Sequence, residues 1–77
     1  MIGHKVERVL ATLSEAGDRV KRLTVTRWGD NPGKLDLRTW GIPENGEMIP
    51  YKGVTLNEEE AETLVDALTD YLNDPGN

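Results

Sequence analysis

The sequence predicts an α+β domain in which a four-stranded antiparallel sheet is followed by one C-terminal helix. Residues 20–40 contain two segments of alternating apolar and polar side chains on either side of a glycine-rich turn, which is typical of a β-hairpin. Residues 58–73 carry apolar side chains at helical spacing. The 77 residues are too few for a second core, so we expect one domain over 1–77, with a disordered tail at 74–77.

The first element, residues 4–14, fits both a helical stripe and an alternating strand. Its β-branched content and the Gly17-Asp18 turn that follows favour a strand paired with 20–28. We therefore expect the first hairpin to close at this turn.

The next two elements are the strands 20–28 and 34–40, and the turn between them runs from Gly29 to Gly33. A loop over 41–50 and a short strand over 53–56 complete the sheet. One sheet face carries four apolar side chains, which we expect the helix to cover: Leu23, Val25, Leu35 and Leu37.

The last element is a helix over about 58–73. Asn57 is a favourable N-cap, and Glu60 three residues later completes a capping-box pattern. The apolar stripe of this helix is wider than one thin sheet face readily covers. We therefore expect this stripe to serve as a dimer interface that includes Leu64, Val65, Leu68 and Tyr71.

The composition excludes several functions. The chain has no cysteine, so it has neither disulfides nor a Cys-based zinc site. It has no catalytic motif and no phosphate-binding glycine loop, and its lone His4 is expected to be neither a ligand nor a catalyst. We expect no enzymatic activity, no cofactor and no metal. No apolar run approaches a membrane span, and a cytoplasmic location is expected, nucleoid-associated in a bacterium.

The charges are unevenly distributed. Residues 1–53 contain all nine Lys and Arg and seven acidic residues, whereas residues 54–77 contain seven acidic residues and no base. Binding responds to the local field, so the net charge of −5 does not exclude a nucleic-acid partner.

The second face of the hairpin combines aromatic, basic and hydroxyl side chains. Cations of this kind follow phosphates, and aromatic rings stack on unpaired bases. The face therefore indicates binding of single-stranded nucleic acid. The alternative for either Trp is that it packs in the core or against a dimer partner. Its members are Arg22, Thr24, Thr26, Trp28, Lys34, Asp36, Arg38 and Trp40.

Two segments resemble the transcriptional positive cofactor 4 family. They are KLDLRTW at 34–40 and NGEMIPYKGVTL at 45–56, which is followed by the acidic helix. The segments RTW (38–40) and KGVTL (52–56) are most similar to the bacterial YdbC-type branch. The resemblance covers about residues 20–72 and implies a symmetric dimer of ββββα chains that binds single-stranded DNA with little sequence preference.

The resemblance also implies site residues and a role in transcription or genome maintenance. Arg38 matches a basic residue of the third strand, Trp40 the aromatic after it, and Lys52 the Lys of a Lys-Gly pair. The loop 41–50 has fewer bases than in eukaryotic members, and we expect no counterpart of their Ser/Lys-rich regulatory extension. The expected nucleic-acid contacts are Arg22, Thr26, Trp28, Lys34, Arg38, Trp40 and Lys52.

Two alternatives stay open. The acidic helix suits a protein-interaction module that docks a basic partner, such as a component of the transcription machinery. The sequence also leaves open whether the nucleic acid is DNA or RNA, because this discrimination depends on which atoms contact the 2′-hydroxyl.

Overall fold

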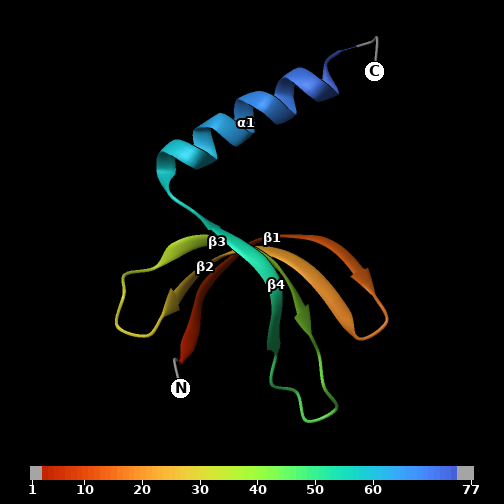
Figure 1. Cartoon of the computed structure of the whole chain (residues 1–77). Coiled ribbons are helices and arrows are strands. Elements are labelled where there is room, and N and C mark those ends of the chain that lie inside the picture. The colour runs from red at the N-terminus through yellow and green to blue at the C-terminus, as the bar shows by residue number, and fades with distance from the viewer. Residues whose placement is uncertain (1–2, 75–77) are drawn as a thin grey trace.

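The computed structural model describes residues 3–74 and shows a sheet followed by a helix (Figure 1). All pairings are antiparallel, and the strand order is β1-β2-β3-β4. The predicted ββββα order is therefore confirmed. The elements are β1 (His4–Ala16), β2 (Arg19–Trp28), β3 (Lys34–Gly41), β4 (Ile49–Leu56) and α1 (Glu58–Leu72).

The element bounds agree with the sequence for the hairpin and the helix and differ at β4. The ambiguous first segment is a strand, β1, and it pairs with β2. The fourth strand begins at Ile49, not at Gly53, because Ile49 pairs with Gly41 and Pro50 with Trp40. Part of the loop predicted at 41–50 thus belongs to the sheet. Of the predicted tail, residues 75–77 lie outside the described residues.

The sheet bends into an arch (Figure 1). β1 has three register shifts against β2, between Val6 and Arg8, between Val9 and Ala11, and after Thr12. Each such shift leaves an extra residue in one strand, which bends the strand and increases its twist. The bulges therefore account for the curvature, which gives the sheet one concave and one convex face.

Alternation along the strands distributes the side chains between these two faces. Leu23, Leu37 and Val54 pair across β2, β3 and β4 and lie on the convex face, toward α1. Among residues 3–74, the well-buried side chains lie on the concave face. They are Val20, Thr24, Thr26, Asp36 and Trp40, none of them more than 1% exposed.

The helix begins as predicted. The side chain of Asn57 accepts a hydrogen bond from the backbone N–H of Glu60, and the Glu60 carboxylate accepts one from the backbone N–H of Asn57. This capping box satisfies two backbone donors of the first turn. No helix within residues 3–74 has the length and apolar character required to cross a membrane.

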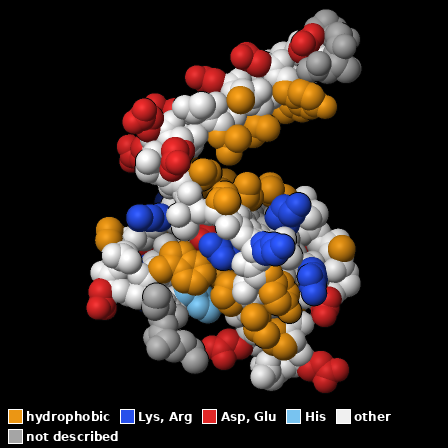
Figure 2. Space-filling model, in the orientation of Figure 1, with side chains coloured by type: hydrophobic (Ala, Val, Ile, Leu, Met, Phe, Trp, Pro, Cys, Tyr) orange, Lys and Arg blue, Asp and Glu red, His pale blue; other side chains and the backbone are white. Residues whose placement is uncertain are grey.

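The helix does not cover its own sheet, contrary to the sequence prediction. It touches the sheet only through β4, and none of its residues is buried. The four leucines and valines expected beneath it are half-buried: Leu23, Val25, Leu35 and Leu37. In Figure 2, apolar side chains of the helix and of the convex face point toward one another across an open space.

The dimensions of the chain show the same separation. Its radius of gyration is 14.4 Å, whereas a compact chain of this length has about 11.5 Å. It exposes 6078 Å², whereas a folded monomer of this size exposes about 4,700 Å². The single chain therefore leaves apolar surface uncovered on both α1 and the convex face.

Candidate nucleic-acid interface

A buried carboxylate organises the concave face. Asp36, on β3, is fully buried, and both of its oxygens accept hydrogen bonds from Arg38, at 2.6 Å from Nε and 2.9 Å from Nη2. The indole Nε1 of Trp28 donates to the same carboxylate at 3.1 Å. A buried charge requires such partners, and alternation along β3 places Asp36 and Arg38 on one face. The result is a fixed orientation for the Trp28 ring.

Arg38 holds Trp28 in a second way, because its guanidinium carbon lies over the indole, 4.6 Å from the ring centroid. Its Nη1 also donates to the backbone carbonyl of Tyr51 at 2.9 Å. The residue opposite Arg38 on β4 is Gly53. A Cβ atom at this position would overlap the Cβ of Arg38 and the carbonyl of Leu37. Glycine is therefore required beside Lys52, which explains the Lys-Gly pair noted in the sequence.

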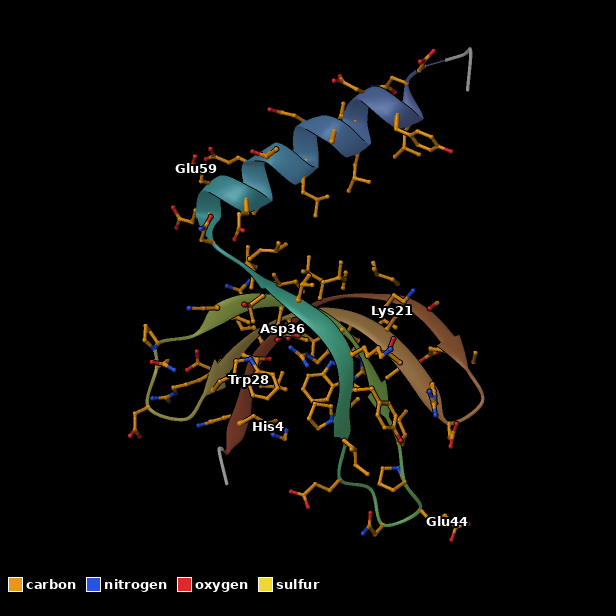
Figure 3. The ribbon with its side chains drawn as sticks, viewed as in Figure 1. His4, Lys21, Trp28, Asp36, Glu44 and Glu59 are labelled. Atoms are coloured by element: carbon orange, nitrogen blue, oxygen red, sulfur yellow. The ribbon has the colours of Figure 1, made fainter. Side chains whose placement is uncertain are left out.

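Three aromatic rings form a row on the concave face. The imidazole of His4 lies 5.4 Å from the Trp28 ring and 5.5 Å from the Trp40 ring, between centroids, at interplanar angles of 38° and 44°. Figure 3 shows His4, Trp28 and Asp36 together beneath the arch. His4 is exposed, Trp28 is half-buried, and Trp40 is 1% exposed.

Trp40 is 1% exposed, so of the two roles left open for each Trp, this ring has the core role in the single chain. The bend of the sheet brings His4 of β1 into contact with Trp40 of β3, although these strands are not neighbours. Thr26 is likewise fully buried, and its hydroxyl lies 2.7 Å from that of Thr24. Neither Trp40 nor Thr26 presents an accessible group in the single chain, and their predicted contacts with nucleic acid stay predictions.

The predicted basic residues occupy different parts of the sheet. Arg22 donates from Nε to the hydroxyl of Thr12 at 3.2 Å and from Nη1 to the sulfur of Met48 at 3.2 Å. Lys34 is exposed at the start of β3. Lys52 is exposed on the edge strand β4, where it lines a depression of about 430 Å³ with Lys21 and Arg38.

Lys52 is thus not gathered with the aromatic row. Figure 3 shows Lys21 on the upper, convex side of the sheet, away from Trp28. Lys52 shares its depression with this residue, so it lies at the rim between the two faces. The structure brings Trp28, Arg38 and Trp40 together and leaves Lys52 at the edge.

A larger depression lies at the turn end of the aromatic row. Its volume is about 830 Å³, and His4, Lys5, Arg27, Trp28 and Asn31 are among its lining residues. Arg27 also forms an exposed ion pair with Glu7, 3.5 Å apart. Two cations and an indole at one depression provide for phosphate contact and base stacking within a short distance of each other.

Sequence reasoning missed His4, Lys5 and Asn31 in this region. His4 pairs directly with Trp28 in the β1–β2 ladder. This pairing would have placed His4 beside Trp28, but it can be recognised in the sequence only when the register of β1 against β2 is known. Three bulges in β1 separate that pair from the Gly17 turn, so counting back from the turn gives the wrong partner.

A comparison with protein-family models matches residues 16–67 to the transcriptional coactivator p15 (PC4) family. The match covers more than half of the chain. The chain belongs to this family. PC4 domains are associated with single-stranded DNA binding and transcription coactivation. No curated protein sequence matches the chain.

The PC4 match extends from the end of β1 into α1. It therefore includes Trp28, Asp36 and Arg38, and it leaves out His4 and Lys5. The resemblance to the YdbC-type branch stays a prediction, since the match identifies the PC4 family alone. Within residues 3–74, no cluster of three or more His, Cys, Asp or Glu side chains is placed to hold a metal ion.

Proposed function

We propose that this PC4-family chain binds single-stranded DNA on the concave face of its sheet, with little preference for sequence and without catalysis. The observation that carries the proposal is the network in which Asp36 and Arg38 fix the half-buried Trp28. A ring already held in place loses little conformational freedom when a base stacks on it. Family membership supports the same function.

The proposal favours a single strand over a duplex for two physical reasons. Base faces are accessible for stacking only when the bases are unpaired. The alternative of a recognition helix in the major groove is unfavourable, because α1 has Glu58, Glu59 and Glu60 in its first turn and no base in its last turn. A helix of this charge repels phosphates.

The distribution of charge supports binding on the concave face. The exposed Lys34 starts β3 on the same face as Asp36 and Arg38. Lys5 and Arg27 pair with each other and alternate to the other face, but they line the depression at the end of the sheet together with Trp28. Figure 2 shows acidic side chains along the outer side of α1, and Figure 3 shows Glu59 on the side of the helix away from the sheet. The helix charge is therefore directed away from the proposed DNA path.

The proposal includes a homodimer in which α1 and the convex face pack against a second copy. Leu64, Val65, Leu68 and Tyr71 are between 37% and 63% exposed, and Val54 on the convex face is 54% exposed. A stable dimer typically buries about 800 Å² per partner, and the area exposed beyond that of a compact monomer is sufficient for this. The second copy is preferred as the occupant because it covers both apolar surfaces at once.

Leu68→Ala tests the dimer. We expect the dimer dissociation constant to rise about 10-fold, because truncating a leucine in the centre of an interface removes buried apolar surface. Sedimentation velocity over a concentration series measures this change. Leu72→Ala, at the last turn of α1, is the matched control with a smaller expected effect. A monomer mass at every concentration for the unmodified chain would contradict the dimer.

Binding itself is tested by fluorescence anisotropy with a labelled single strand of about 20 nucleotides and with the matching duplex. We expect the single strand to bind more tightly at every salt concentration. If 3–4 phosphates are neutralised, log affinity falls against log salt with a slope of about −2 to −3. Equal affinity for the duplex would contradict the proposal, and tighter binding of an RNA strand of the same sequence would assign the face to RNA.

A further inference from the structure

We propose that His4 is a nucleic-acid contact residue and provides the exposed stacking surface that the sequence assigns to Trp40. This inference rests on the proposed function, because it names the ring on which a base stacks in the same site. It concerns a residue outside the segment that matches the family model, which begins at residue 16.

The first argument is accessibility. Trp40 is 1% exposed, so its ring offers no free face to a base in the single chain. One face of the Trp28 indole is covered by the Arg38 guanidinium, 4.6 Å from the ring centroid. His4 contacts both indoles and is itself exposed. It is therefore the member of the row that is most open to solvent.

The second argument is orientation. The imidazole is in contact with two aromatic rings, 5.4 Å from Trp28 and 5.5 Å from Trp40 between centroids. Its backbone is held as well, since the neighbouring Gly3 carbonyl accepts a hydrogen bond from the N–H of Gly29 at 2.8 Å. A ring positioned before binding loses less side-chain entropy on binding than a free surface histidine does.

The third argument is the position of His4 between two depressions. One, of about 830 Å³, contains Lys5, Trp28 and Asn31, and the other, of about 310 Å³, contains Asn45, Met48 and Ile49 among its lining residues. His4 lines both. A strand that passes from one depression to the other crosses the imidazole, which places a base over this ring.

A fourth observation concerns the indole Nε1 of Trp40, which is buried and has no hydrogen-bond partner. A buried donor without a partner is unfavourable, and a group at this position that accepts a hydrogen bond would relieve it. The donor lies on a ring that His4 contacts. A nucleotide bound at His4 therefore lies next to an indole whose N–H lacks an acceptor, although this N–H is itself inaccessible in the single chain.

The direct test is NMR of the unmodified protein, prepared without a histidine tag. The chain has one histidine, so the two carbon-bound imidazole protons give one unambiguous pair of signals. We expect both signals to move upfield when oligothymidine is added, because a stacked base shields the ring beneath it. Signals that stay in place while the protein is saturated with DNA would overturn the proposal.

The contribution of the His4 ring to the affinity for single-stranded DNA is measured with two variants. His4→Ala is expected to weaken binding of oligothymidine about 5- to 20-fold, toward the lower part of the range for loss of one base–aromatic stack. His4→Phe, which keeps a flat ring, is expected to stay within about 2-fold of the unmodified protein. If both variants bind as the unmodified protein does, the role of His4 is wrong.

Failure of this proposal is distinguishable from failure of the proposed function. If the unmodified protein binds the single strand but the His4 signals do not move, the function stands and His4 is not a contact. If the unmodified protein does not bind a single strand, both proposals fail. The NMR measurement requires no substitution. It therefore decides whether His4 contacts DNA even if the His4→Ala variant does not fold.

Discussion

Replacing Asp36 by alanine is expected to lower the free energy of unfolding by about 3–5 kcal/mol, the range for breaking a buried ion pair by removing one partner. The carboxylate is fully buried and accepts hydrogen bonds from Arg38 and Trp28. Without it, the largely buried guanidinium has no counter-charge and the indole N–H has no acceptor. Urea unfolding at one fixed protein concentration measures the loss.

The matched control is Asp30→Ala. Asp30 is exposed in the turn between β2 and β3, so its removal is expected to change the free energy of unfolding by less than about 0.5 kcal/mol. A loss below about 1 kcal/mol for Asp36→Ala would show that the network does not hold the concave face together. The Trp28 ring would then require another explanation for its orientation.

Trp28→Ala is expected to weaken single-strand binding roughly 5- to 150-fold, the equivalent of about 1–3 kcal/mol for one base–aromatic stack. The ring is half-buried at the concave surface and lines the depression that also contains Lys5 and Arg27. Anisotropy with the labelled strand measures the change in affinity. Circular dichroism and the sedimentation profile establish that the variant is folded.

Trp28→Phe separates stacking from the network. This variant keeps an aromatic ring and loses the Nε1 donor to Asp36, so we expect a smaller loss of affinity than for alanine. Equal losses for the two variants would mean that the hydrogen bond to Asp36, and not the ring, is what binding requires. Unchanged affinity in a folded Trp28→Ala variant would remove the residue from the site.

The sequence predicted those parts of the fold that depend on local patterns. The hairpin of β2 and β3 has strict alternation and a glycine-rich turn, and α1 has a capping box with an apolar stripe. Such signals are contained within a few neighbouring residues. The family resemblance was also contained in short segments, and the family match confirms it.

The parts that the sequence did not predict depend on curvature and on long-range register. The three shifts in β1 leave no local mark in the sequence, yet they bend the sheet so that His4 covers Trp40. The same bend buries Thr26, which alternation alone places on an open face. The expected cover of α1 over Leu23 and Leu37 was wrong because a sequence pattern shows an apolar face without showing what packs against it.

The central claim is that a single strand binds on the concave face. The most direct measurement is a titration of isotope-labelled protein with oligothymidine, followed through backbone amide and indole N–H signals. The chain has two tryptophans, so the Trp28 indole signal can be assigned with one variant. The account predicts shifts of this signal and of amides in β2 and β3 around Asp36, with those of α1 unchanged. Shifts confined to α1, or none at saturating DNA, would contradict the account.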